Sequence, residues 1–194
     1  MVGDPARPDP LLNSENLVES FQPVIGQSVT IRPLQPGDAE IERRFVTGLS
    51  EETRYNRLLG GSMKITDAYI RRLIEVDGVH EVALAAITML EGSEIIIGVG
   101  RYVIEADGGS CEFALVVADA WQGRGIGRRM LEKLIAIARA RGIAFITGDV
   151  LSTNIAMLTL ARHMGFALAR HPDDATVTRV RRALQTATGT QGAQ

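Results

Sequence analysis

Apolar residues follow two different periods along the middle of this chain. In several segments they alternate with polar residues or form short β-branched runs, which is typical of strands. These segments are Ser28–Leu34, Glu81–Leu90, Glu94–Ile104, Cys111–Val117, Ala144–Val150, Phe166–Arg170 and Thr176–Ala183. Glycine-containing turns join the second, third and fourth of them, and such short links predict consecutive antiparallel strands.

Between the strands, apolar residues recur at the three- to four-residue spacing of a helix face. Helices are predicted over Ala39–Leu49, Ser50–Leu59, a stretch beginning at Thr66, Gly125–Arg141 and Asn154–Met164. Asp38, Ser50 and Thr66 stand where helix N-caps belong, because their side-chain oxygens can accept a hydrogen bond from a free backbone N–H. The alternation of strands and helices predicts an α/β (α+β) fold, with a central mixed sheet flanked by helices on both faces.

The periodic pattern covers residues 28–184, which we predict to be one domain, because a single core commonly serves roughly 100–200 residues. Residues 1–27 have prolines near their start and no sustained period, so we expect a mobile or loosely attached tail. Residues 185–194 are small and polar, and we expect a flexible tail there too.

Composition narrows the class of protein. Hydrophobic residues make up 45% of the chain and charged residues 23%, as in ordinary soluble globular proteins. A formal net charge of −2 gives no strong field for nucleic acid or an anionic membrane. The N-terminus lacks the basic start and apolar stretch of a signal peptide, and the most apolar run, Val82–Leu90, is too short to cross a bilayer. We therefore predict a cytoplasmic protein that binds neither nucleic acid nor membrane.

The cysteine and histidine content argues against a metal site. Cys111 is the only cysteine, so no cysteine metal cluster can form, and a small core residue is the favoured interpretation of it. His80, His163 and His171 share no metal-ligand spacing. Asp149 ends a predicted strand, where we expect it to cap a turn rather than to line a site. No metal is predicted.

The segment Gln122–Gly127, of sequence QGRGIG, has the composition of an anion-binding loop. It lies between an apolar strand and an amphipathic helix, whose N-terminus offers free N–H groups and a partial positive charge. Glycines allow backbone N–H groups to approach a phosphate without a Cβ in the way. Arg124, Arg128 and Arg129 add cations around the same point. The loop therefore predicts a phosphate-bearing ligand.

Two other phosphate loops are excluded by residue type. The dinucleotide pattern G-x-G-x-x-G requires glycine at position 128, which is Arg128, and the repeated βαβ context is missing. The Walker pattern ends in Gly-Lys-Ser/Thr, and this loop contains no lysine.

What remains resembles the acyl-CoA loop of the GNAT superfamily of N-acetyltransferases, Q/R-x-x-G-x-G/A, with Gln122, Gly125 and Gly127 at the defining positions. The resemblance implies the GNAT fold, whose largely antiparallel sheet splays beside its fourth strand to admit acetyl-CoA. It implies that the CoA pyrophosphate is held by the backbone of Gln122, Gly123, Arg124, Gly125, Ile126 and Gly127, with Arg128 nearby. It also implies that Leu115, Val116 and Val117 pair with the pantetheine amides as a neighbouring strand would.

A second resemblance to the family lies in the segment from Asn154 to Gly165-Phe166. It implies that Asn154 hydrogen-bonds the cofactor arm, although a plain N-cap explains the same residue, and the two roles are compatible. Many family members carry a tyrosine seven residues after this asparagine, as the acid that protonates the leaving thiolate. Here that position is Ala161, so the common general acid is absent.

Glu112 is the candidate general base. Aminolysis of a thioester needs a neutral amine, and deprotonating a lysine-like amine at neutral pH costs roughly 4–5 kcal/mol. Glu112 lies in an otherwise apolar strand, where partial burial would raise its pKa toward the range that a base requires. A glutamate here also resembles bacterial Pat-type protein-lysine acetyltransferases. The alternative interpretation is a residue on the exposed face of a half-buried strand.

The acceptor is an amine of undetermined class. The segment Leu49–Leu58 resembles part of the Pat-type domain, with Ser50, Thr53, Tyr55 and Arg57 matching best. This resemblance favours a protein lysine. A small-molecule amine, or a non-catalytic acetyl-CoA-sensing module, are the alternatives, and the sequence is compatible with a monomer or a homodimer.

Overall fold

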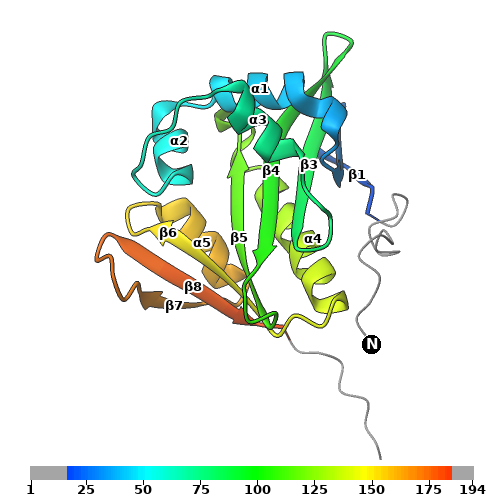
Figure 1. Cartoon of the computed structure of the whole chain (residues 1–194). Helices are drawn as coiled ribbons and strands as arrows, with labels where there is room; N and C mark the ends of the chain where they lie inside the picture. Colours follow the sequence, from blue (N-terminus) through cyan, green and yellow to red (C-terminus); the bar gives the residue numbers. More distant parts are fainter. Residues whose placement is uncertain (1–16, 185–194) are drawn as a thin grey trace, which may run out of the picture.

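The computed structural model describes residues 17–184, so the predicted tails at residues 1–16 and 185–194 lie outside the described residues. Eight strands form one sheet in the order β1-β2-β3-β4-β5-β6-β8-β7 (Figure 1). The strands are β1 Glu19–Val24, β2 Gln27–Pro33, β3 Glu81–Leu90, β4 Ser93–Ile104, β5 Ser110–Val117, β6 Phe145–Leu151, β7 Ala167–Arg170 and β8 Val177–Ala183. The predicted meander is confirmed in β3, β4 and β5, which pair antiparallel in chain order.

The helices are α1 Ala39–Gly48, α2 Glu51–Arg57, α3 Asp67–Ile74, α4 Ile126–Ala140 and α5 Ile155–His163, with single 3-10 turns at Pro36–Asp38 and Asp119–Trp121. α1 and α3 cover one face of the sheet, and α4 and α5 pack in the core cluster of the other (Figure 1). The prediction of helices on both faces is confirmed. Within residues 17–184, no helix is long and apolar enough to span a membrane.

The helix N-caps follow the sequence prediction in two of three cases. Ser50 Oγ accepts a hydrogen bond from the backbone N–H of Thr53 at 3.1 Å, and Thr66 Oγ1 caps α3 in the same way. The prediction for Asp38 is wrong, because its carboxylate does not cap α1. It accepts two 2.7 Å hydrogen bonds from the guanidinium of Arg32 instead, which holds the pKa of Asp38 below its ordinary value against the effect of burial.

The N-terminal boundary of the domain is a correction. Residues 1–27 were expected to be loosely attached throughout, but β1 pairs with β2 from Glu19↔Ile31 to Val24↔Gln27. The pairing is irregular between Phe21 and Val24. β1 is an edge strand that is held by its pairing with β2, by packing of Phe21 against the core and by ion pairs of Glu19 with Arg129 and Lys133.

The sheet opens between β5 and β6, which form the one parallel pair among the described strands. This pairing has three positions, Ser110↔Phe145, Cys111↔Ile146 and Glu112↔Thr147. β5 continues beside β4 as far as Val117, while β6 continues beside β8. The predicted splay beside the fourth strand is therefore found beside β5, which is fifth in the structure because β1 precedes the predicted strands.

Candidate active site

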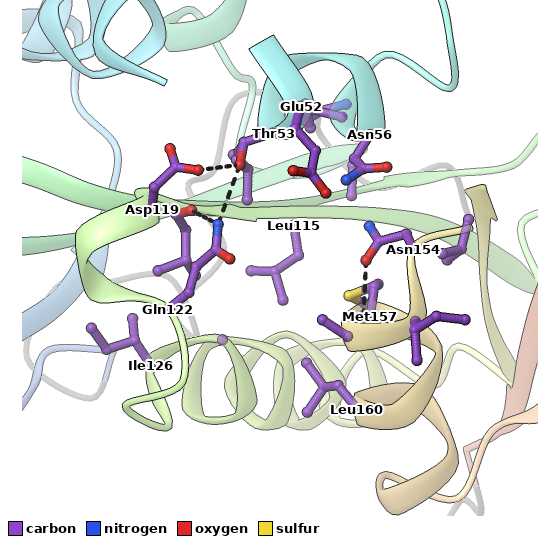
Figure 2. A pocket seen from close by; sticks show the side chains of 18 of the residues that line it. Glu52, Thr53, Asn56, Leu115, Asp119, Gln122, Ile126, Asn154, Met157 and Leu160 are labelled. Carbon is purple, nitrogen blue, oxygen red and sulfur yellow. Dashed lines mark hydrogen bonds between the residues drawn. The ribbon is translucent and has the colours of Figure 1, made fainter. Parts of the chain in front are cut away.

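A cleft of about 650 Å³ fills the opening between β5 and β6. Side chains from α2, β5, the loop before α4, β6 and the start of α5 line it (Figure 2). It therefore brings together segments that are far apart in the sequence. Of the predicted site residues it contains Glu112, Leu115, Val116, Val117, Gln122, Gly123, Gly125, Ile126, Gly127, Arg128 and Asn154, and Arg124 lies in the same loop.

The glycines of the loop have a conformational reason to be glycine. Gly123 and Gly125 have φ angles of +72° and +79°, in the left-handed region that other residues rarely adopt. A Cβ at either position would meet no heavy atom within 4 Å, so the backbone faces open space. Gly125 is also the N-cap residue of α4, where the free N–H groups of the helix begin. The loop thus presents backbone donors to the cleft, as an anionic group requires.

Two side chains of the loop have partners within the protein. Gln122 Nε2 donates to the backbone carbonyl of Val117 at 3.0 Å and to Thr53 Oγ1 at 3.3 Å. The guanidinium of Arg124 lies 5.1 Å from the ring centroid of Trp121. Arg128 bonds Glu132 one turn further along α4, and both side chains are largely exposed. The Arg128 guanidinium can therefore turn toward a phosphate at small cost.

The backbone of β5 offers hydrogen-bonding groups to the cleft at alternate residues. The N–H of Ala118 donates to the carbonyl of Ile97 in β4. The alternation of an antiparallel ladder therefore directs the backbone N–H and carbonyl of Val116 toward β4 as well. Leu115 and Val117 then direct their backbone groups toward the opening. The geometry therefore favours Leu115 and Val117 for pairing with an extended ligand, and not Val116.

Asn154 lies at the opposite wall of the cleft from Gln122 (Figure 2). Its Oδ1 caps α5 by accepting a hydrogen bond from the N–H of Met157 at 3.0 Å. Seven residues further on, Ala161 is fully buried in the core. No tyrosine lines the cleft in the part of the chain described here.

Glu112 is exposed to the cleft at the point where β5 and β6 separate. Within residues 17–184 its carboxylate has no hydrogen-bond or ion-pair partner. Partial loss of water around the carboxylate, followed by repulsion from Asp149, raises the pKa of Glu112, whereas Arg179 and Arg57 act in the opposite direction. A carboxylate with a raised pKa and no partner is suited to accept a proton. Its neighbour Cys111 is a buried core residue, and burial raises the pKa of its thiol to about 12.

The environment of Glu112 includes a charge cluster that sequence reasoning missed. Asp149 does not cap a turn as expected; it lies within β6 and lines the cleft. Arg179 on β8 donates two 2.9 Å hydrogen bonds to its carboxylate, and this pairing lowers the pKa of Asp149. Arg179 Nη2 also lies 2.8 Å from His171 Nε2. Asp149 and Arg179 are neighbours only because β6 pairs with β8, and no local sequence motif predicts that pairing.

Sequence reasoning also missed a second pair of charged residues, which lies beneath α2. Glu42 of α1 has only 1% of its surface exposed, and its Oε2 has no hydrogen-bond partner among the described residues. Burial raises the pKa of Glu42 to about 7, although Arg101 and Arg57 oppose this shift. Arg57 also faces the cleft, so it is a cation placed between Glu42 and Glu112.

Comparison with known proteins agrees with this geometry. The chain matches the model of the acetyltransferase (GNAT) family over residues 62–166. It is 34% identical over 165 residues to an acetyltransferase of Pseudomonas aeruginosa, covering 85% of this chain and 88% of that protein. It is 31% identical over 157 residues to the acetyltransferase Pat of Mycolicibacterium smegmatis, covering 80% of this chain but 46% of Pat.

Solved structures show the same fold. The GNAT domain of S. lividans PAT has a TM-score of 0.76 and 28% sequence identity, covering 88% of this chain and 98% of that chain. The structure of yncA from Salmonella typhimurium with its cofactor acetyl-CoA has a TM-score of 0.63 at 18% identity, covering 85% of this chain and 99% of that chain.

Proposed function

Because the chain belongs to the acetyltransferase (GNAT) family and is an acetyl-CoA-dependent N-acyltransferase, we propose that it acetylates a protein lysine with Glu112 as the general base. The observation that carries this proposal is the position of Glu112, which faces the cleft where β5 and β6 separate. Glu112 lies in the same strand as Leu115 and Val117, the residues whose backbone we expect to hold the cofactor arm.

The donor fits the residues that are present. Acetyl-CoA supplies an acetyl thioester at the end of a long arm that carries a pyrophosphate. The backbone N–H groups of the loop from Gln122 to Gly127 would hold the pyrophosphate, and Arg128 can add charge. The backbone groups of Leu115 and Val117 would pair with the arm, and Asn154 lies where it can bond the arm from the opposite wall.

The proposed chemistry requires two acts from the protein. Glu112 removes a proton from the acceptor ammonium, because only the neutral amine attacks a thioester. The N–H of Leu115 donates a hydrogen bond to the carbonyl oxygen on which negative charge develops. The neutral amine then forms a C–N bond to the thioester carbon, the C–S bond breaks, and the nitrogen loses its second proton to solvent. Since Ala161 offers no hydroxyl, we propose that the leaving thiolate takes its proton from solvent in the cleft.

Two properties of the cleft support a lysine on a protein surface. Glu52, Glu112 and Asp149 line it, so it suits an acceptor that arrives as a cation. Two large apolar side chains on the lining are also exposed, Leu59 by 39% and Ile155 by 64%. Apolar side chains beside a charged cleft are a surface that a polypeptide can cover, whereas a small amine would leave them in water.

The experiment that tests this proposal measures free thiol released from acetyl-CoA, with mass spectrometry of the products. The protein is offered small amines, polyamines, lysine peptides and a whole protein extract. Acetylated lysine in peptides or proteins is the expected result. Acetylation of small amines alone would replace the proposed acceptor with a small molecule and leave the family assignment intact.

A further inference from the structure

The helix α2 forms one wall of the cleft without contributing to the core. It projects Glu52, Thr53 and Asn56 toward the cofactor loop on the other side (Figure 2). None of the side chains of α2 is buried, and the helix is only two turns long. Burial of apolar surface, which holds α1 and α3 on the sheet, therefore contributes little to the position of α2. Polar contacts carry much of its attachment instead, in addition to Arg57, which lies near Glu42 beneath the helix.

These polar contacts converge on Asp119, in the 3-10 turn between β5 and the cofactor loop. One carboxylate oxygen of Asp119 accepts the backbone N–H of Ser50 at 3.0 Å. The other accepts the hydroxyls of Ser50 at 2.6 Å and Thr53 at 2.7 Å. These hydrogen bonds lower the pKa of Asp119 to about 2, so the carboxylate is ionised throughout the neutral range. Ionised acceptors make stronger hydrogen bonds than neutral ones.

The hydroxyl of Thr53 also joins α2 to the first residue of the cofactor loop. Thr53 Oγ1 donates to Asp119 and accepts a hydrogen bond from Gln122 Nε2, as the dashed lines of Figure 2 show. Gln122 Nε2 also donates to the carbonyl of Val117 on β5. An unbroken chain of hydrogen bonds thus runs from the acceptor wall to the residues that hold the donor.

We propose that Asp119, Thr53 and Gln122 form a link through which cofactor binding fixes α2, the wall of the cleft opposite the cofactor loop. This inference rests on the proposed cofactor loop. A ligand that holds the backbone of Gln122 also restricts its side chain, and the side chain then holds Thr53. Ordering of one site by the ligand of another gives positive coupling between the two ligands. Asp119 and Thr53 are positioning residues in this arrangement.

The experiment is hydrogen–deuterium exchange of the α2 amides with and without saturating coenzyme A, which cannot react. Trp121 is the only tryptophan of the chain and adjoins the loop, so its fluorescence reports binding in the same samples. In the wild type, coenzyme A is expected to slow exchange in α2 by about fivefold, the equilibrium change that one net hydrogen bond contributes. In Thr53→Val, which keeps the β-branched shape without the hydroxyl, this slowing is expected to disappear.

Three further variants distinguish loss of this hydrogen-bonded link from a general loss of structural stability in the protein. Thr53→Ser restores the hydroxyl and is expected to restore the effect. Thr66→Val removes the N-cap of α3 and is expected to leave the effect on α2 unchanged. Asp119→Asn weakens the same link through a second residue and is expected to reduce the slowing.

The outcomes distinguish this inference from the proposed function. Equal slowing of α2 exchange in the wild type and in Thr53→Val would overturn the link, as would coenzyme A binding to the wild type without any change in α2. Failure of coenzyme A to change Trp121 fluorescence or exchange anywhere in the wild type would contradict the cofactor site itself, and the link with it.

Discussion

Glu112 and Thr147 are the last pair in the parallel ladder between β5 and β6. Beyond them β5 follows β4 and β6 follows β8, so the two strands leave each other at the carboxylate of Glu112. The divergence frees one edge of β5 for a ligand and places a carboxylate at the closed end of that edge. The proposed base and the proposed donor site are thus two results of one interruption in strand pairing.

Replacing the proposed base tests its role in turnover. Glu112→Gln is expected to lower kcat by about a hundred- to ten-thousandfold, because the amide cannot take the proton of the acceptor. Coenzyme A affinity, measured by Trp121 fluorescence, is expected to stay within about twofold. Glu40→Gln, an exposed carboxylate of α1 paired with Arg44, is the matched control. Normal turnover in Glu112→Gln would exclude this residue as the base.

The pH dependence should report the raised pKa of Glu112. Only the ionised carboxylate is a base, so kcat/KM is expected to fall as the pH drops through a value above the ordinary 4.5. Asp149→Asn removes a repelling charge and leaves Arg179 uncompensated, which lowers the pKa of Glu112 and moves the inflection to lower pH.

Arg179→Gln should act in the opposite direction, because it removes an attracting charge and leaves Asp149 unpaired. Its inflection is expected at higher pH than in the wild type. Profiles of kcat/KM for the two variants make a matched pair, and shifts of the same sign in both would show that another group controls the rate.

The loop glycine offers a test of donor binding. Gly125→Glu forces a side chain into a backbone with φ of +79° and adds a negative charge at the N-terminus of α4. Coenzyme A affinity is expected to fall on the order of a hundredfold, since a distorted loop backbone costs about 1–3 kcal/mol and charge repulsion at the helix N-terminus about 0.3–2 kcal/mol. Isothermal titration measures it.

The control for this variant is Gly142→Glu, which follows α4 and has a similar φ of +75°. It carries comparable backbone strain far from the loop, so its stability should fall while coenzyme A binding persists. If both variants bind coenzyme A alike, the loop assignment is wrong.

The raised pKa of Glu42 predicts that the free energy of unfolding depends on pH. In the folded protein Glu42 keeps its proton up to about pH 7, whereas in the unfolded chain it releases the proton near pH 4.5. Raising the pH between these two values therefore favours unfolding. Glu42→Gln removes this contribution. Its unfolding free energy relative to wild type is expected to rise by about 2–3 kcal/mol between pH 5 and pH 8. Urea unfolding at both pH values measures it, with Glu40→Gln as the exposed control that should show no such change.

Local sequence patterns predicted most of the fold. β3 occupies Glu81–Leu90 as predicted, and Ser50 and Thr66 cap their helices, because period and capping depend on neighbouring residues alone. β1 was missed because its six residues include Pro23 and few apolar positions. An edge strand of this kind is defined by its partner, which lies outside any local window.

The candidate site was predicted only where a motif carries it. The loop from Gln122 to Gly127 is contiguous, so its spacing was visible in the sequence. Asp149, Arg57 and Glu42 were not visible as a group, because β-sheet pairing and helix packing bring Asp149 and Arg57 to the cleft, and Glu42 close to Arg57, from distant segments. The register of β5 likewise distinguishes Leu115 from Val116, which composition cannot do.

The shallow attachment of α2 has a consequence for how such proteins diversify. Since no side chain of this helix is fully buried, much of its sequence can be exchanged without repacking the sheet, provided that Ser50, Thr53 and Asp119 keep their hydrogen bonds and Arg57 stays near Glu42. Substrate choice can then evolve, or be redesigned in the laboratory, on one short replaceable module while the donor half is inherited unchanged.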